Sequence, residues 1–239
     1  MSEKFRFNRV LLKISGESLK GEQEHGYDAN AVRAVVQQVK NIMDQGVEVA
    51  LVVGAGNIWR GVMGRSGGMD RVNADYMGML ATVMNALCLK DFFQQAGVTA
   101  LVQCSVNMEP IAPRFDRERT IRALEAGTLV IFAGGTGSPF FTTDTTATLR
   151  ALETDCDAVL KATKVDGIYT ADPFKDPSAE RFTEISFDEA LARQLKVMDS
   201  TAFSMCRDND LPIIVFNFSD PSSLERVLQG DTEAGTIVC

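Results

Sequence analysis

Three short apolar runs that each end directly in a glycine-rich turn constrain the fold of this chain more than any other feature. The runs are continuous rather than alternating and rich in branched residues, which is typical of strands buried on both faces of a parallel sheet. In such sheets ligands bind beyond the carboxyl ends of the strands. The sequence therefore predicts a binding edge made of three turns. The runs and their turns are Arg9–Ile14 with Ser15-Gly16, Val47–Val53 with Gly54–Asn57, and Thr128–Ala133 with Gly134–Gly137.

Helical patterns alternate with strands along the whole chain. This alternation predicts an α/β fold, a three-layer αβα sandwich with a mainly parallel central sheet, formed as a single domain by residues 1–239. Asp28 or Asn30 can cap the first helix, which Gly46 ends. The 70–96 helix is apolar on most sides, which indicates burial in the core or against another subunit. Further strands are predicted at Val98–Cys104, Ala158–Ala162, Ile213–Phe216 and, at an edge, Thr236–Val238. Further helices are predicted at Arg117–Ala126, Thr143–Glu153, Phe187–Leu195, Thr201–Asn209 and Ser222–Gln229.

Composition argues against several classes of protein. The net charge is −8 and the Lys and Arg residues are scattered, so a nucleic-acid partner is not expected. Five cysteines without a CxxC pair indicate reduced thiols in a cytoplasm. His25 is the only histidine, so neither a Ser-His-Asp triad nor a His/Cys zinc site is expected. The 1–8 segment lacks an apolar signal core, and the longest apolar run, 76–89, is too short to span a membrane.

Lys13 stands one residue before the end of the first predicted strand. An edge lysine could extend its ammonium group to water. Alternatively, Lys13 is a cation aimed at a phosphate beyond the strand, and Gly16 lets backbone amides approach that phosphate closely. On the residues alone the two interpretations are equally good.

The second turn, Gly54-Ala55-Gly56-Asn57-Ile58-Trp59-Arg60-Gly61, resembles a dinucleotide-binding fingerprint. Trp59 stands where the third glycine is required, which argues against a nicotinamide dehydrogenase. The turn is then either a tight strand-to-helix connection or an anion-binding nest with Arg60 as its cation, because a guanidinium binds phosphate in a bidentate way.

The third turn continues through 134–144 as Gly-Gly-Thr-Gly-Ser-Pro-Phe-Phe-Thr-Thr-Asp. No regular element needs this order of glycines, threonines and aromatic residues, which favours a shaped pocket with amides and hydroxyls for polar groups and rings for a flat base. In a purely structural interpretation, Asp144 is a partner of the helix dipole. We favour a functional role for the segment.

A polar segment at 161–173 is the most ambiguous. Asp166-Gly167 is typical of a hairpin turn. In the functional interpretation, Tyr169 and Asp172 contact a nucleotide, and either Lys161 or Lys164 faces its phosphates. A Walker A motif is absent, since Glu22 stands where its lysine must be, and the protein-kinase HRD and DFG signatures are missing.

These segments, in this order and over essentially the whole chain, resemble the amino acid kinase family, and within it the branch that acts on UMP. The resemblance implies the amino acid kinase fold, with residues 1–150 mainly binding the acceptor and 151–239 mainly binding ATP. It implies reversible transfer of the γ-phosphoryl group of ATP to UMP, with Mg²⁺ accompanying ATP. That reaction belongs to de novo pyrimidine nucleotide and CTP biosynthesis. The matching segments are Lys13–Glu17, Gly54–Gly61, Asp75–Thr82, Thr136–Asp144, Lys161–Pro173 and Lys196–Asp199.

Functional residues of the family carry over to this chain by position. Catalytic roles are implied for Lys13, Arg60, Asp144, Asp199 and Lys161. An ATP site is implied at Lys13, Ile14, Ser15, Gly16, Gly56, Arg60, Thr163, Tyr169 and Asp172. A UMP site is implied at Ala55, Asp75, Thr136, Gly137, Ser138, Pro139, Phe140, Phe141, Thr142 and Thr143. The family commonly has glycine at the position of Ala55, where a methyl group fits only if φ is negative.

Regulation and assembly are also implied by the resemblance. GTP is expected to activate the protein through Gly21, Glu22, Gln23, Glu24, His25 and Gly26, and UTP is expected to inhibit it. A homohexamer is expected, which would account for the apolar character of the 70–96 helix. No metal ligand from the protein itself is assigned.

A mechanism based on the residues agrees with the resemblance. Because a UMP phosphate is already ionised, the protein needs no general base and must instead bring two anions together. Lys13, Arg60, Mg²⁺ and amides at Gly16, Gly54, Gly56, Gly135 and Gly137 would neutralise charge, while Asp144 and Asp199 hold a lysine or the metal. Two alternatives remain: a kinase of the same family acting on a carboxylate or carbamate, and a non-catalytic nucleotide-binding or storage protein.

Overall fold

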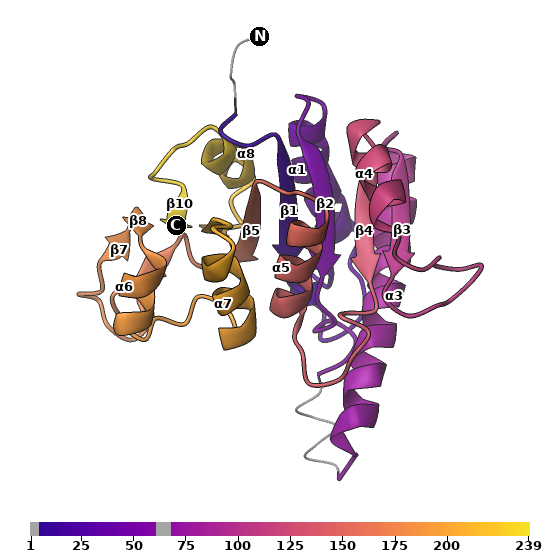
Figure 1. Cartoon of the computed structure of the whole chain (residues 1–239), viewed down its shortest axis with the longest axis horizontal. Coiled ribbons are helices and arrows are strands. Elements are labelled where there is room, and N and C mark those ends of the chain that lie inside the picture. Colours follow the sequence, from indigo (N-terminus) through magenta and orange to yellow (C-terminus); the bar gives the residue numbers. More distant parts are fainter. Residues whose placement is uncertain (1–4, 61–67) are drawn as a thin grey trace.

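An eight-stranded sheet forms the centre of the molecule (Figure 1). The structure is a computed structural model that describes residues 5–60 and 68–239. All neighbouring strands of the sheet are parallel except β9 and β10, which confirms the predicted mainly parallel architecture. In spatial order the strands are β3 (Ala100–Cys104), β4 (Leu129–Ala133), β2 (Glu48–Val53), β1 (Arg9–Ile14), β5 (Ala158–Thr163), β9 (Ile213–Asn217), β10 (Gly235–Val238) and β8 (Glu184–Ile185).

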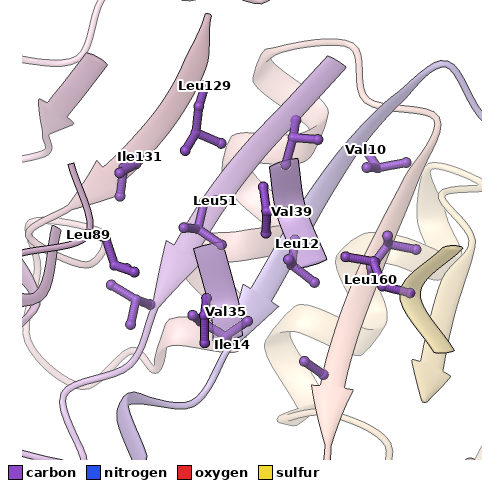
Figure 2. Close-up of a cluster of buried hydrophobic side chains, with 14 of the residues drawn as sticks. Val10, Leu12, Ile14, Val35, Val39, Leu51, Leu89, Leu129, Ile131 and Leu160 are labelled. Atoms are coloured by element: carbon purple, nitrogen blue, oxygen red, sulfur yellow. The ribbon is translucent and has the colours of Figure 1, made fainter. Parts of the chain in front are cut away.

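Helices cover both faces of this sheet and create two hydrophobic cores. In β1, Val10, Leu12 and Ile14 face one core and Leu11 faces the other, which explains why the run is apolar throughout. Figure 2 shows Val35 and Val39 of the first helix over these strands. The first core is covered by α1 (Ala29–Met43), α3 (Arg71–Gln95) and α8 (Ser223–Leu228). The second is covered by α4 (Arg117–Glu125), α5 (Thr143–Glu153), α6 (Phe187–Ala192) and α7 (Ser200–Asp208).

Side-chain caps fix where several helices begin. Asp28 accepts the Ala31 amide at 2.8 Å, as predicted, and Asp70 caps α3. Gly46, at φ +94°, follows α1 in the left-handed region that glycine adopts without strain. No helix within the described ranges is both long and apolar enough to cross a membrane.

Three features differ from the sequence predictions. The last strand, β10, is not at the edge, because the two-residue β8 pairs outside it. The predicted hairpin at Asp166-Gly167 is wrong, since β6 (Ile168–Tyr169) pairs with β7 (Arg181–Phe182) instead of β5. The glycine turn predicted after β1 is the start of a 3-10 helix, η1 (Gly16–Leu19), which Ser15 caps. Gly61 of the second turn lies outside the described residues.

Candidate active site

The first two glycine turns pack against each other where β1 and β2 end. The two strands are in register, so Ile14 lies beside Val53, and the Gly54 amide donates to the Ile14 carbonyl at 3.0 Å. A Cβ atom on Gly16 would lie 2.4 Å from the Gly54 carbonyl oxygen, a distance no side chain tolerates. Gly16 is therefore required by the close approach of the two turns.

A buried cluster of two lysines and one carboxylate lies beside these turns. Lys13 and Lys161 are register partners on β1 and β5. Their ammonium nitrogens lie 2.8 Å and 2.7 Å from the two carboxylate oxygens of Asp144, at the start of α5. The three side chains are only 13–17% exposed. Because β1 is central in the sheet, the interpretation of Lys13 as an edge residue is wrong.

The electrostatics of this cluster follow from burial and opposite charge. Burial alone would raise the pKa of Asp144, but the charges of Lys13 and Lys161 outweigh burial and lower it. Burial lowers the pKa of Lys161, and Asp144 opposes that effect. Lys161 also donates to the Val197 carbonyl at 2.6 Å. The cluster thus keeps one net positive charge in a partly dehydrated place, which favours binding of an anion.

Asp199 connects the first turns of two helices. Its carboxylate accepts the Thr145 hydroxyl at 3.0 Å, the Thr142 hydroxyl, and the Ala202 amide at 2.9 Å. Thr142 and Thr145 belong to the start of α5, and Asp199 caps α7. Within the described ranges, no ion pair joins Asp199 to a lysine, although its negative charge acts on Lys161 and opposes the lowering of that pKa by burial.

A cavity of about 240 Å³ lies beside the start of α5, and we call it the smaller cavity. Six of the residues predicted to bind UMP line it: Ala55, Asp75, Thr136, Phe141, Thr142 and Thr143. Gly137, Ser138, Pro139 and Phe140 are not in its lining, although they belong to the same loop. The sequence assigned Gly135 only as an amide donor, and it assigned no contact to the remaining lining residues, which are Trp59, Ala74, Gly78, Met79 and Thr82.

Asp75 fastens the loop that closes this cavity. Its carboxylate accepts the Phe140 amide at 2.8 Å and the Arg71 Nε at 2.7 Å. Phe140 has φ +75°, an uncommon conformation for a bulky residue, and the residue is 64% exposed. Ala55 has a φ outside the left-handed region, so its methyl group is tolerated as the sequence required.

Backbone amides of the turns differ in availability. The Gly54 amide is bonded to Ile14 and the Gly137 amide to the Gly134 carbonyl at 3.0 Å, so these two predicted donors are already used. Within residues 5–60 and 68–239, the amides of Gly56 and Gly135 have no hydrogen-bond acceptor, and they remain candidates for an anion.

Glu17 is a functional candidate that sequence reasoning did not assign to a contact. Its carboxylate pairs with Arg60 and lies 3.4 Å from the Lys164 ammonium. Arg60 and Lys164 are both largely exposed, whereas Lys161 belongs to the buried cluster. Lys161, rather than Lys164, is therefore the lysine that pairs with Asp144.

A second, larger cavity of about 530 Å³ opens beyond β1, β5 and β9. Ser15 and Thr163, both predicted to contact ATP, line it together with Glu17 and Lys164. Tyr169 and Asp172 line neither cavity. The Tyr169 hydroxyl donates to Asp166 at 2.6 Å, and Asp172 pairs with Lys175 at 3.4 Å.

The loop predicted to bind GTP is tied to the second turn. The Gly26 amide donates to the Asn57 carbonyl at 2.8 Å, and the Asn57 side chain donates to the Gly26 carbonyl at 3.1 Å. Asn57 is fully buried and also bonds Asn85 of α3. A change in this loop can therefore reach both the turn and the helix.

Comparisons with known proteins agree with this geometry. Residues 8–217 match the amino acid kinase family. A UMP kinase from Bacillus anthracis is 35% identical, with 97% of this chain and 96% of that chain covered and a TM-score of 0.94. A UMP kinase from Ureaplasma parvum is also 35% identical, over 98% and 99%, with a TM-score of 0.92. A uridylate kinase from Archaeoglobus fulgidus is 26% identical, over 96% and 99%, with a TM-score of 0.73.

Proposed function

The chain is a member of the amino acid kinase family, and we propose that it transfers the γ-phosphoryl group of ATP to UMP, giving UDP and ADP. The observation that carries this proposal is that two buried lysines pair with Asp144. Asp144 directly follows Thr142 and Thr143, which line the smaller cavity. A nucleotide seated in that cavity would present its phosphate to two cations. The similarity to UMP kinases over nearly the whole chain supports UMP as the acceptor.

Positioning and charge neutralisation account for the proposed chemistry. The attacking oxygen of a nucleotide phosphate is already ionised, so no side chain must remove a proton, and the barrier is the approach of two anions. Lys13 and Lys161 would offset the charge that develops on the transferred group. Asp144 would keep both ammonium groups in place, and the amides of Gly56 and Gly135, which have no acceptor among the described residues, would add donors.

Mg²⁺ is part of the proposal because it offsets phosphate charge when it is bound. It usually keeps several waters and is bound through substrate phosphates and one or two carboxylates. No cluster of three His, Cys, Asp or Glu side chains that could hold a metal occurs in the described part of the chain. Asp199 is the carboxylate we assign to contact it, because the groups bonded to it within the described residues are two hydroxyls and an amide.

A side-by-side assay of ADP release tests the proposed reaction. ATP is offered with UMP, CMP, TMP or AMP in turn, and UMP should give the highest kcat/KM. Equal rates with all acceptors, or faster turnover with a carboxylate or carbamate, would contradict the assignment. Binding of UMP and ATP without ADP release would instead indicate a non-catalytic nucleotide-binding protein.

We propose further that GTP activates and UTP inhibits this enzyme. The 21–26 loop supports the first part, because its bonds to Asn57 connect it to the turn beside the lysine cluster. Rates measured with each nucleotide added alone test both parts. If GTP acts through the loop, Asn57→Ala should abolish activation, whereas unchanged activation in this variant would refute that route.

A hexamer is the proposed assembly, with α3 at an interface. Tyr76, Met77, Leu80 and Met84 lie on this helix and are 39–53% exposed, which is a large apolar surface for one helix. Light scattering should give the mass of six chains, and Leu80→Glu should release smaller species. A monodisperse monomer for the unmodified protein would contradict the proposal.

The cellular setting we propose is the cytoplasmic de novo synthesis of pyrimidine nucleotides, in which UDP leads to CTP. Depleting the protein in cells should raise UMP and lower UDP and CTP. Unchanged nucleotide pools would contradict this setting while leaving the reaction itself testable in vitro.

A further inference from the structure

Arg150 of α5 is a buried cation that the proposed phosphoryl transfer does not use. The residue is 6% exposed, and its guanidinium lies 3.8 Å from the ring centroid of Phe115. The Phe132 ring lies near the same group at 5.9 Å, and Glu153 pairs with it. Burying a guanidinium is costly unless its donors are used, so the destination of its remaining donors is informative.

One of these donors leads to the wall of the smaller cavity. Arg150 Nη2 donates to the Ser105 hydroxyl at 2.8 Å, and that hydroxyl donates to the Gly135 carbonyl at 2.5 Å. Gly135 lines the smaller cavity. The chain of hydrogen bonds therefore runs from α5, through the residue that follows β3, to the glycine turn that follows β4.

The turn needs such a tether because its backbone is unusually free. Gly134, Gly135 and Gly137 have φ values of +75°, +57° and +82°, and glycine readily adopts many other conformations. The turn also packs closely against the Cys104–Ser105 segment, since a Cβ on Gly134 would lie 2.6 Å from Cys104 Sγ. The Thr82 hydroxyl holds the Gly134 amide at 2.9 Å, and the Ser105 bond is the one that fixes the Gly135 carbonyl.

We propose that Arg150 is a positioning residue for the acceptor turn 134–137, and that it acts through the Ser105 hydroxyl. By donating to the Ser105 oxygen, Arg150 leaves the hydroxyl proton directed at the Gly135 carbonyl. This bond holds the turn in the conformation that shapes the smaller cavity. The inference rests on the proposed function in one respect, namely that UMP is the ligand of this cavity.

The expected effect is a weaker acceptor affinity with an unchanged donor affinity. When only a fraction of molecules holds the competent conformation, the apparent Kd rises by the inverse of that fraction. Loss of one buried hydrogen bond is large enough to reduce that fraction to roughly a tenth. Ser105→Ala and Arg150→Met should each weaken UMP binding about tenfold and leave the Kd of an ATP analogue unchanged.

A double-mutant cycle distinguishes this role from general loss of stability. Isothermal titration with UMP is carried out on Ser105→Ala, Arg150→Met and the double variant. If Arg150 acts through Ser105, the double variant binds UMP no more weakly than Ser105→Ala alone. Ser223→Ala is the matched control, because Ser223 is a buried serine whose hydroxyl donates to the Asp220 carbonyl at 2.9 Å, and it should lower Tm without changing the Kd of UMP.

Hydrogen exchange supplies a readout that does not require UMP. In the free protein, the Gly137 amide bonded within the turn should exchange faster in Ser105→Ala and Arg150→Met than in the unmodified protein or the Ser223→Ala control. The inference would be overturned if Ser105→Ala bound UMP as tightly as the unmodified protein. It would also be overturned if the losses of UMP affinity in the two single variants added up in the double variant, or if the Gly137 amide exchanged at an unchanged rate. An unmodified protein that binds no UMP would refute the proposed function instead, and exchange would still decide the role of Arg150. Should Arg150→Met fail to fold, Ser105→Ala alone carries the test.

Discussion

Replacing Asp144 with Asn removes the charge that holds Lys13 and Lys161 together. Both ammonium groups lie within 2.8 Å of the carboxylate, and all three side chains are 13–17% exposed. Removing one partner of a fully buried ion pair lowers the free energy of unfolding by about 3–5 kcal/mol. Because water still reaches this cluster, we expect a loss near the lower end, about 3 kcal/mol. Loss of one preorganised donor raises the barrier by about 3–4 kcal/mol, so kcat should fall by about 10²–10³.

The pH dependence of this variant gives a sharper test than its rate alone. Asp144 supports the charged form of Lys161 against burial, so the pKa of Lys161 falls further in Asp144→Asn. The alkaline limb of the kcat profile should therefore move to lower pH. In the unmodified protein the folded pKa of Asp144 is lowered. Its stabilising effect is therefore present above the unfolded value of about 3.9 and is lost as the pH falls through the folded value.

Two measurements and one control complete the test. A coupled assay of ADP release gives kcat against pH, and urea denaturation between about pH 3 and 7 gives stability, which should converge in acid for the two proteins. Asp155→Asn is the control, since Asp155 pairs with Arg117 at the surface, where such a pair contributes about 0–1 kcal/mol. An Asp144→Asn enzyme with kcat within about threefold of the unmodified one and an unmoved alkaline limb would refute the reasoning.

Three further predictions test other parts of the account. Gly16→Ala should destabilise the fold by about 1–3 kcal/mol in urea, because its Cβ would collide with the neighbouring turn; an unchanged midpoint would contradict the close approach. Asp75→Ala should raise the KM for UMP about tenfold and leave that for ATP unchanged, since the Phe140 amide loses its acceptor; equal changes in both would argue against it. Burial raises the pKa of Cys156 to about 12, so a disulfide reagent at pH 8 should label exposed Cys239 and leave Cys156 unreacted until unfolding.

Continuous apolar runs were enough to predict most of the sheet. Arg9–Ile14 and the helix Thr143–Glu153 have the predicted bounds, because burial on both faces and a strong N-terminal cap leave clear signals in the sequence. The edge strand Glu184–Ile185 left none, since two residues carry no periodicity. Its pairing outside β10 depends on the folded sheet.

The sequence predicted which residues form the candidate site better than it predicted the contacts between them. Lys13, Lys161 and Asp144 were all identified, but their meeting depends on the register of β1 against β5, which sequence spacing does not specify. The pairing of Glu17 with Arg60 joins segments 43 residues apart and had no local signal. Asp75 was predicted to bind UMP and does line the smaller cavity, but its bond to the Phe140 amide of the neighbouring loop had no signal in the sequence.

A crystal structure with UMP and a non-hydrolysable ATP analogue tests the central claim most directly. The account predicts the UMP base in the smaller cavity and its phosphate within about 3 Å of the Lys13 or Lys161 ammonium, with the analogue's γ-phosphate on the opposite side of the same two lysines. Well-ordered nucleotides bound away from both lysines, with the cavity and the three glycine turns unoccupied, would contradict it.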